Sequence, residues 1–171
     1  MHAGNAQTHK ERIYFELDSN DWHGHGSEGI WAEKLTSPAS DQTYRLLNSP
    51  FFARGVSFMD VIRARPSSDG NRLQFAGVYA RGGHSTYMIL VPTGSPRFTL
   101  YWERLRSAGC THESTTLDTS DGKKDLYAVD VPPASDAYAI YATLEDGERD
   151  QTWLFQEGHF GHVRRVKTQN R

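Results

Sequence analysis

Six residues near the middle of the chain combine types that can do chemistry at close spacing. The stretch "RGGHST", positions 81–86, holds an arginine, two glycines, a histidine and two hydroxyl side chains. Adjacent glycines let backbone N–H groups converge on an anion, and an arginine adds a permanent positive charge. A histidine transfers protons near neutral pH. We therefore predict a binding site formed by Arg81, Gly82, Gly83, His84, Ser85 and Thr86.

The same stretch supports an alternative, in which the protein is a small hydrolase or transferase. His84 would then be the base, Ser85 the nucleophile and Arg81 the anion-binding group. No carboxylate lies next to His84 in the sequence to orient its ring, so the pattern does not define a triad. The chain also lacks a G-x-x-x-x-G-K-[ST] loop and a G-x-S-x-G motif. These absences favour a protein without enzymatic activity and leave the enzyme as the alternative.

Two alternating apolar runs flank this stretch, "RLQFAGVYA" at 72–80 and "STYMILVP" at 85–92. A period of two is typical of half-buried strands, and a Gly-Gly pair between two such runs is typical of a hairpin turn. We therefore expect "RGGH" to be a tight turn that places His84 beside the edge of a sheet.

Two histidine pairs, in "WHGHG" at 22–26 and "HFGH" at 159–162, are the candidate metal ligands. Imidazoles at alternate positions of a strand share a face and can bind zinc. Both pairs lie in glycine-rich segments, and no cysteine or acidic residue stands at a ligand spacing beside them. We therefore predict solvated loop histidines, with no metal and no cofactor. The weak metal candidates are His23, His25, His159 and His162.

The segment "NSPFFARGVSFMD", positions 48–60, is too apolar for an exposed loop, and its proline disfavours a regular strand. We predict an irregular segment that plugs the core, with Asp60 holding either Arg54 or a backbone amide. The alternative is an aromatic anchor for a partner. Arg54 is a further candidate binding residue.

The remaining patterns predict an α+β fold. Period-two runs predict strands at 12–18, 30–35, 43–48, 60–65 and 72–80. After the strand at 85–92, Ser95 and Gly109 are placed to begin and end a helix, and Ser135 and Gly147 a second one. Strands at 110–117, 125–131 and 152–158 complete the order. We expect Tyr138, Tyr141, Ala142 and Leu144 to face inward on the second helix.

The order of these elements divides the chain into two halves of one compact unit. We expect a flexible tail at 1–11 and a small β-barrel-like region at 12–92. A ferredoxin-like region of βαββαβ order follows at 87–158, and it shares the strand 87–92 with the barrel. Residues 159–171 are expected to be a basic tail.

Composition narrows the class of protein. Hydrophobic residues make up 37% of the 171 residues, which suffices for a packed core. The net charge of −2 supplies no general basic field, which argues against nucleic acid as a partner. Cys110 is the only cysteine, and no apolar run resembles a signal peptide or a membrane span. We therefore expect a cytoplasmic protein that does not bind a membrane.

Three stretches carry a resemblance to a known family. The chain from about residue 29 to about residue 162 resembles an uncharacterised bacterial family of unknown function. The resemblance lies in "GIWAEKL", "NSPFFARGVSFMDVIRAR" and "VYARGGHSTYMILV". It implies a shared fold and no particular activity. Small cytosolic proteins of such families are in some cases immunity proteins that neutralise toxins.

We therefore expect a non-enzymatic protein-binding module, most concretely a toxin-neutralising immunity protein or a regulatory protein, which covers a partner's active site. Acidic residues in or beside the predicted loops are candidates for such a face. They are Asp18, Asp21, Glu28, Asp118, Asp121, Asp125, Glu145, Asp146, Glu148 and Asp150. A further alternative is an RNA-binding protein, because arginines alternate with aromatic residues across neighbouring strands. These residues are Arg63, Arg65, Arg72, Arg81, Phe75 and Tyr79.

Overall fold

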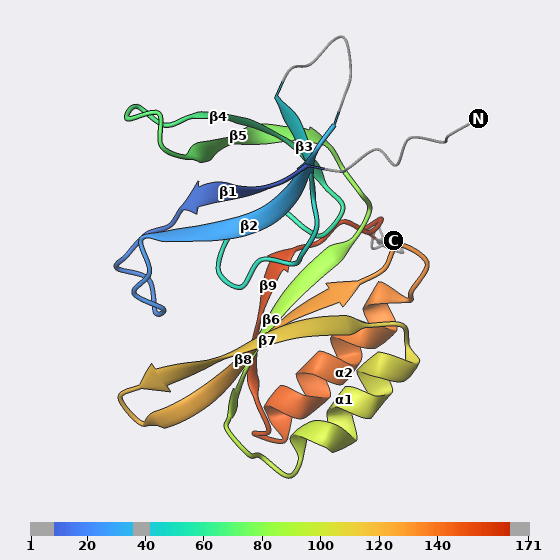
Figure 1. Cartoon of the computed structure of the whole chain (residues 1–171). Helices are drawn as coiled ribbons and strands as arrows, with labels where there is room; N and C mark the ends of the chain where they lie inside the picture. Colours follow the sequence, from blue (N-terminus) through green and yellow to red (C-terminus); the bar gives the residue numbers. More distant parts are fainter. Residues whose placement is uncertain (1–8, 36–41, 165–171) are drawn as a thin grey trace, which may run out of the picture.

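The computed structural model describes residues 9–35 and 42–164, and it has an α+β fold made mostly of strands, with two helices. The N-terminal half is a set of five strands that we call the ring (Figure 1). Its members are β1 (Lys10–Glu16), β2 (Ser27–Lys34), β3 (Thr43–Leu46), β4 (Val61–Pro66) and β5 (Leu73–Ala80). Neighbouring strands along the chain pair antiparallel. The ring closes because β1 also pairs in parallel with β5, with Ile13 opposite Leu73.

Alternation along these strands fills the interior of the ring. Odd-numbered residues of β1 and even-numbered residues of β2 point inward, so that Ile13 and Ile30 are fully buried opposite each other. Phe15 and Phe75 stack at a centroid distance of 4.5 Å as part of this core. The polar positions of the same strands therefore lie on the outer surface of the ring.

The C-terminal half is a four-stranded antiparallel sheet with two helices, which we call the sheet. Along the chain its members are β6 (Ser85–Pro92), α1 (Phe98–Ser107), β7 (Thr111–Thr119), β8 (Gly122–Val131), α2 (Ala137–Arg149) and β9 (Leu154–His159). The strand order is β7-β8-β6-β9. Both helices pack on the same face of the sheet, and the ring lies on the other side of the sheet from them (Figure 1).

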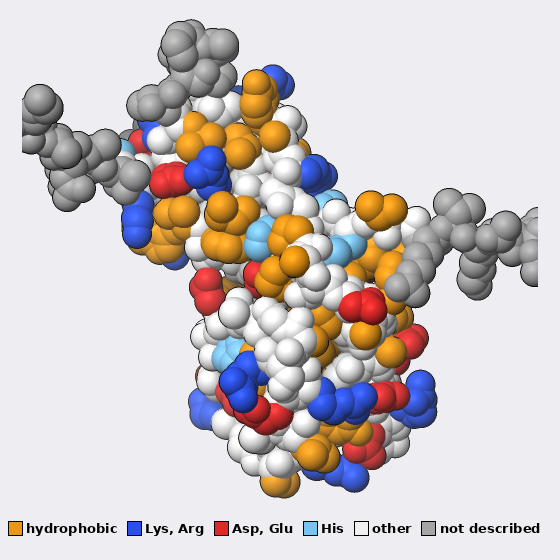
Figure 2. Space-filling view, turned by 90° about the vertical axis from the view of Figure 1, so that its right-hand side faces the viewer, with side chains coloured by type: hydrophobic (Ala, Val, Ile, Leu, Met, Phe, Trp, Pro, Cys, Tyr) orange, Lys and Arg blue, Asp and Glu red, His pale blue; other side chains and the backbone are white. Residues whose placement is uncertain are grey.

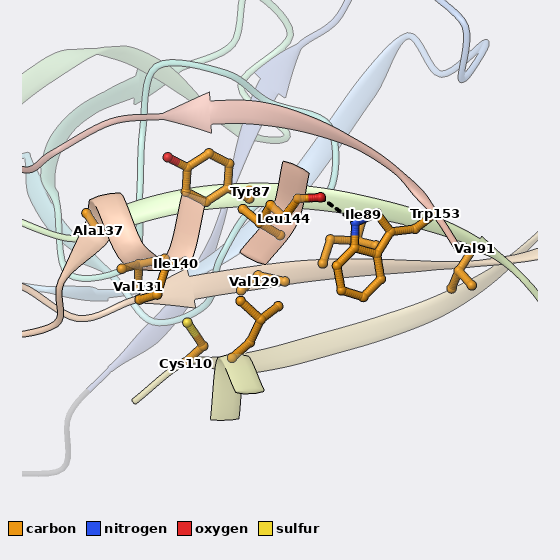
Figure 3. Close-up of a cluster of buried hydrophobic side chains, with 11 residues drawn as sticks. Tyr87, Ile89, Val91, Cys110, Val129, Val131, Ala137, Ile140, Leu144 and Trp153 are labelled. Atoms are coloured by element: carbon orange, nitrogen blue, oxygen red, sulfur yellow. Dashed lines mark hydrogen bonds between the residues drawn. The ribbon is translucent and has the colours of Figure 1, made fainter. Parts of the chain in front are cut away.

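The main core lies between the sheet and its helices (Figure 3). Tyr87 and Ile89 of β6 are fully buried, and they meet Leu144 of α2. Trp153 is 2% exposed, and its Nε1 donates to the Leu144 carbonyl at 3.0 Å. This indole therefore ties the end of α2 to the start of β9.

Several element boundaries differ from the sequence predictions. β1 begins at Lys10, inside the expected tail, and β2 begins at Ser27 rather than at residue 30. Residues 1–8, most of the expected turn at 36–42, and residues 165–171 of the expected basic tail lie outside the described residues. The strand at 85–92 is confirmed, and β7 and β8 form an antiparallel hairpin whose turn contains Asp121 and Gly122.

The helix starts were predicted wrongly. The N-cap of α1 is Arg97, which makes no side-chain cap, and Ser95 lies two residues before it. The N-cap of α2 is Asp136 rather than Ser135, and its carboxylate accepts from the amides of Tyr138 and Ala139. An aspartate and a serine cap equally well, so composition alone did not separate the two positions.

The inward face of α2 was also assigned wrongly. Each residue turns a helix by about 100°, so an error of one or two positions moves a side chain from core to surface. Tyr141 is 38% exposed and Ala142 is exposed, whereas Ile140 is buried. Of the four residues assigned inward, Leu144 is buried and Tyr138 is half-buried. Gly147 lies inside the helix and does not end it. The buried residues of α2 are Ala137, Ile140, Thr143, Leu144 and Gly147.

The prediction that "RGGH" forms a hairpin turn is wrong. β5 pairs with β4 and β1, whereas β6 pairs with β8 and β9. Residues 81–84 therefore form a crossover that leads the chain from the ring into the sheet. Two alternating strands in sequence are compatible with a hairpin or with strands of two separate sheets, and the alternation does not tell them apart.

Neither helix in residues 9–35 and 42–164 is long and apolar enough to cross a membrane.

We expect Gly147→Ala to destabilise the protein. A Cβ atom at position 147 would meet the indole ring of Trp153, which is held by its hydrogen bond to Leu144. Overpacking of this kind costs about 1–3 kcal/mol. Urea denaturation followed by tryptophan fluorescence measures the change, with Glu145→Ala on the exposed side of α2 as the control. Equal midpoints for the two variants would contradict the expected clash.

Candidate binding site at the junction of the ring and the sheet

The residues singled out in the sequence meet where the ring joins the sheet. The irregular segment 49–60, which we call the plug, fills part of the space between them, as predicted. Its residues Ala53 and Val56 are buried in the core of the ring. The crossover, residues 81–84, passes beside the plug, and Gly82 lies so close to Met59 that a Cβ atom would come within 2.6 Å of the Met59 backbone. Only glycine fits this approach.

A single carboxylate joins the plug to the crossover. Asp60 is fully buried, and its Oδ1 accepts from the Gly82 amide at 2.8 Å. Its Oδ2 accepts from the Ser57 amide at 3.0 Å and from Arg81 Nη1 at 2.9 Å. Arg81 Nη1 also donates to the carbonyl of Gly55 at 2.7 Å. Asp60 therefore holds backbone amides, as predicted, but its cation is Arg81 and not Arg54.

His84 forms a pair with an aspartate of the sheet. Its Nδ1 lies 2.8 Å from Oδ1 of Asp130 on β8, and its ring meets Phe58 edge-on at 5.2 Å. An ionised carboxylate only accepts, so Nδ1–H is the donor in that state. Burial raises the pKa of the Asp130 carboxyl, and the adjacent His84 lowers it by a smaller amount. The carboxylate that orients His84 thus exists in the fold, although it is remote in sequence.

Ser85 is bound to a different histidine. Its Oγ lies 2.7 Å from His162 Nδ1 and accepts from the Gly161 amide at 2.9 Å. His162 Nε2 lies 3.0 Å from the Pro132 carbonyl, which can only accept, so Nε2 carries a proton and the neutral ring accepts from Ser85 through Nδ1. Ser85 has no exposed surface. The structure therefore pairs His84 with Asp130 and Ser85 with His162, and it does not bring His84 and Ser85 into one hydrogen-bonded set.

Gly83 and Thr86 complete the predicted stretch. Gly83 has a φ of 82° and packs against Pro133, and it lines a surface hollow of about 570 Å³ beside the start of α2. Thr86 is buried, and its hydroxyl donates to Ser57 Oγ of the plug at 2.8 Å. The six residues 81–86 thus fasten the ring to the sheet, and most of their hydrogen-bonding atoms are used within the chain.

Asp130 also lines a small cleft between the ring and the sheet, with a volume of about 240 Å³. Glu113 and His112 of β7 lie in the same cleft. Burial raises the pKa of Glu113, with a further contribution from Glu28, and burial lowers the pKa of His112. The cleft disfavours charged side chains, and it is smaller than the roughly 300–1,000 Å³ of sites for small molecules.

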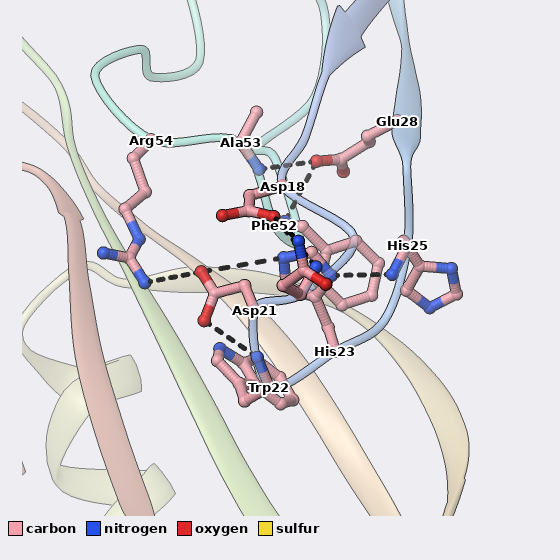
Figure 4. A network of polar contacts seen from close by, with 10 residues as sticks. Asp18, Asp21, Trp22, His23, His25, Glu28, Phe52, Ala53 and Arg54 are labelled. Carbon is pink, nitrogen blue, oxygen red and sulfur yellow. Dashed lines mark hydrogen bonds and ion pairs between the residues drawn. The ribbon is translucent and has the colours of Figure 1, made fainter.

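Arg54 lies in a second polar network, between the β1–β2 loop and the plug (Figure 4). Its Nη2 contacts Asp21 Oδ2 at 3.2 Å, and the oxygen of the Gln156 amide faces its guanidinium. Glu28 accepts from three consecutive amides of the plug, at Phe51, Phe52 and Ala53, at distances of 2.6–2.9 Å. Two carboxylates, Glu28 and Asp60, therefore hold the two ends of the plug.

The candidate metal ligands fall into two places. His23 and His25 stack on each other at 5.7 Å and both contact Phe52. His159 ends β9, and His162 is engaged with Ser85 and Pro132. Within the described ranges, no group of three or more His, Cys, Asp or Glu side chains is arranged to hold a metal ion. Burial raises the pKa of the Cys110 thiol to about 12, so this residue is a core side chain rather than a nucleophile.

Most of the acidic residues proposed as a docking face are engaged within the protein. Five are in ion pairs with arginine or lysine: Asp21, Asp118, Asp121, Asp146 and Asp150. Others hold amides or hydroxyl groups: Asp18, Glu28, Asp125 and Glu148. Cations within the chain therefore offset the charge of five of the ten acidic residues.

An apolar cleft that the sequence did not indicate lies on the face of the sheet opposite the helices. It has a volume of about 170 Å³ and is lined by Trp22, Met88, Leu90, Leu126, Leu154, Phe155 and Gln156. Trp22 reaches it from the β1–β2 loop and is 47% exposed, and Leu154 of β9 is 61% exposed. Trp22 sits in a glycine-rich polar loop, and only the three-dimensional course of that loop brings it over the sheet.

Together these features define an α+β protein in which a closed ring of strands is fastened to a helix-backed sheet. Residues 28–155 match a family described as a domain of unknown function, DUF4265, and the chain belongs to that family. This membership confirms the resemblance noted in the sequence.

Comparison with solved structures gives a likeness in fold. The chain is similar to a hypothetical protein from Neisseria gonorrhoeae whose crystal structure was described as novel, with a TM-score of 0.62 and 14% identity over 90% of this chain and 96% of that one. No curated protein matches the chain.

We expect Asp60→Ala to lower the free energy of unfolding by about 3–5 kcal/mol, since it leaves the amides of Ser57 and Gly82 and the guanidinium of Arg81 without their buried acceptor. Urea denaturation measures the loss. Asp69→Ala, in the exposed β4–β5 turn, is the matched control. A loss no greater than that of the control would show that Asp60 does not fasten the two halves.

We expect the free energy of unfolding of Asp130→Asn, expressed relative to that of the wild type at the same pH, to rise as the pH increases from 3 to 7. The folded-state pKa of Asp130 is raised, so the wild-type carboxyl favours the folded state when protonated and loses that contribution as the pH rises through the raised pKa. An asparagine does not titrate. Denaturation of both proteins across this pH range gives the difference, and a difference that is flat or falls with pH would contradict the assignment.

Proposed function

We propose that the protein is a non-enzymatic protein-binding module, and that the apolar cleft beneath Trp22 receives an apolar side chain of its partner. The observation that carries the proposal is the exposure of Trp22 and Leu154 around a cleft lined almost wholly by apolar side chains. Tryptophan is among the residues most enriched at the centres of protein interfaces. At about 170 Å³ the cleft is smaller than typical small-molecule sites, which favours a single inserted side chain.

The surroundings of the cleft support a partner that binds by apolar contact. Beside Trp22, Asp21 and Arg54 form an ion pair, and the described residues that line the cleft include no charged side chain. Trp22 is braced by His23 and Phe52, which pack against it edge-on or tilted. A braced indole loses little freedom when a partner binds. We therefore infer a partner that presents an aliphatic or aromatic side chain from an uncharged patch.

In its narrower form the proposal is that the partner is a toxin and that binding here occludes its active site, or that the module regulates an enzyme in the same way. This narrower form rests on the family resemblance. We propose the bacterial cytoplasm as the compartment, which is compatible with Cys110 being a free thiol.

We also infer two finer features of the fold. The ring is best described as a small barrel, because β1 pairs with β5 and closes it. The sheet is best described as ferredoxin-like, because its βαββαβ order and its strand order β7-β8-β6-β9 fit the split βαβ arrangement.

The binding proposal is tested with Trp22→Ala. The immobilised protein is incubated with lysate from its native cells, and retained proteins are quantified by mass spectrometry. We expect one protein that is retained in near-stoichiometric amount by the wild type and falls about tenfold or more with Trp22→Ala, because loss of an interface tryptophan commonly costs at least 2 kcal/mol.

Leu100→Ala is the matched control, because Leu100 is also an exposed apolar residue, at 67%, but lies on α1. Retention of the partner by this variant at the wild-type level supports the cleft as the site. Equal retention by the wild type and Trp22→Ala, or no retained protein at all, would refute the proposal.

A further inference from the structure

The ring and the sheet differ in whether their lysine and arginine side chains contact carboxylates. Each described lysine or arginine of the sheet and its helices contacts a carboxylate: Arg97, Arg104, Arg106, Lys123, Lys124, Arg149 and Arg164. On the ring, among the same described residues, the cations that contact no carboxylate are Lys10, Arg12, Lys34, Arg63, Arg65 and Arg72. In Figure 2, several Lys and Arg side chains of the upper half lie beside hydrophobic ones, and positive and negative side chains adjoin on the lower half.

Three of these arginines lie over aromatic rings. The guanidinium carbon of Arg12 is 5.2 Å from the centre of the Trp31 ring, and that of Arg72 is 4.8 Å from the centre of Tyr14. A third pair is Arg63 over Tyr79, at 5.1 Å. Cations on aromatic faces are attracted by the ring quadrupole, and here they keep their N–H groups available to solvent.

The first two pairs form one continuous surface on the outside of the ring. Arg12 of β1 is directly opposite Trp31 of β2, and Tyr14 is directly opposite Gly29. A Cβ atom at Gly29 would lie 3.2 Å from the Tyr14 ring and 3.3 Å from Arg12 Nε, so both side chains lie across this glycine. The order across the surface is therefore Arg72, Tyr14, Arg12 and Trp31, in which cations and aromatic rings alternate.

This surface is hollowed into a cleft of about 450 Å³. Lys10, Arg12, Tyr14, Trp31 and Arg72 all line it, and among the described residues Glu11 is the only acidic one that does so. Trp31 is 47% exposed. The cleft thus combines a local excess of positive charge with an exposed tryptophan, although the whole chain has a net charge of −2.

We propose that this cleft binds single-stranded RNA. Phosphates would contact Lys10, Arg12 and Arg72, and a base would stack on the exposed Trp31, which is how charged grooves with aromatic side chains hold single strands. The unpaired arginines leave forked N–H donors that suit phosphate oxygens. The total charge of the chain argues against nucleic acid, but binding depends on the charges near the phosphates, and these are concentrated on the ring.

Asn71 favours RNA over DNA as the occupant. It lines the same cleft, and its amide nitrogen donates to Asp69 Oδ2 at 3.3 Å. That orientation leaves the amide oxygen as an acceptor at the cleft. A ribose 2′-hydroxyl is a donor that DNA lacks, and it is the group by which proteins distinguish the two.

Fluorescence anisotropy with a labelled twelve-nucleotide oligouridine at low salt tests the proposal on the full chain. We expect saturable binding, weakened about tenfold or more by Trp31→Ala, since stacking on one aromatic side chain is worth about 1–3 kcal/mol per base. The double variant R12A/R72A should also weaken binding. It should reduce the slope of log affinity against log salt by about 1.4, because each lost phosphate contact on a single strand contributes about 0.7.

The matched controls are Trp22→Ala and the double variant R106A/R149A, which remove an exposed tryptophan and two exposed arginines elsewhere. Both should bind RNA as the wild type does. Because all these side chains are on the surface, circular dichroism and the melting temperature should not change. A melting temperature of Trp31→Ala equal to that of the wild type, together with unchanged RNA affinity, would overturn the proposal.

Three further results would also overturn the proposal. Binding that does not weaken with salt would show that phosphates are not contacted. Displacement of the RNA by polyglutamate at the same concentration of charge would identify the surface as a site for acidic proteins. Equal affinity for oligothymidine would overturn the assignment to RNA, and weaker binding of oligothymidine that becomes equal in Asn71→Ala supports it.

Discussion

The relation between the two halves of this protein depends on the buried carboxylate of Asp60. It is withdrawn from water, and burial of a carboxylate is costly unless donors replace the lost hydration. Those donors come from the plug, through Ser57, and from the crossover, through Gly82 and Arg81. The ring and the sheet therefore keep their relative position only when both segments are in place. Gly82 permits the approach, because a side chain there would collide with Met59.

This fastening explains why the residues that look most reactive in the sequence have mainly structural contacts. A crossover between two sheets needs flexible glycines, and its polar side chains must find partners where it is buried. Arg81, Ser85 and Thr86 do so through Asp60, His162 and Ser57. The surfaces that remain open lie elsewhere, in the cleft beneath Trp22 and on the outside of the ring. The two clefts have no described lining residue in common, so a substitution in one leaves the other intact.

The sequence predicted local structure better than it predicted contacts between distant segments. Period-two alternation located most strands, and the plug was recognised because an apolar segment with a proline is neither a strand nor a loop. Alternation does not indicate which strands pair, so a hairpin was predicted where the structure has a crossover between two sheets. The partners of His84 and Ser85, namely Asp130 and His162, are remote in sequence and became adjacent only through the sheet. Trp22 was missed because an isolated aromatic residue in a polar loop has no period.

The parallel pairing of β1 with β5 also determines the order in which the chain can fold. Each antiparallel pair of the ring forms between strands that follow one another, so these contacts are local and fast. The closing pair joins the first strand to the fifth, with Ile13 opposite Leu73, and it must wait until the whole ring has emerged from the ribosome. Until then β1 is an exposed edge that can pair with other chains. Chaperone dependence and co-translational aggregation should therefore be concentrated in this interval of synthesis, before the fifth strand is available.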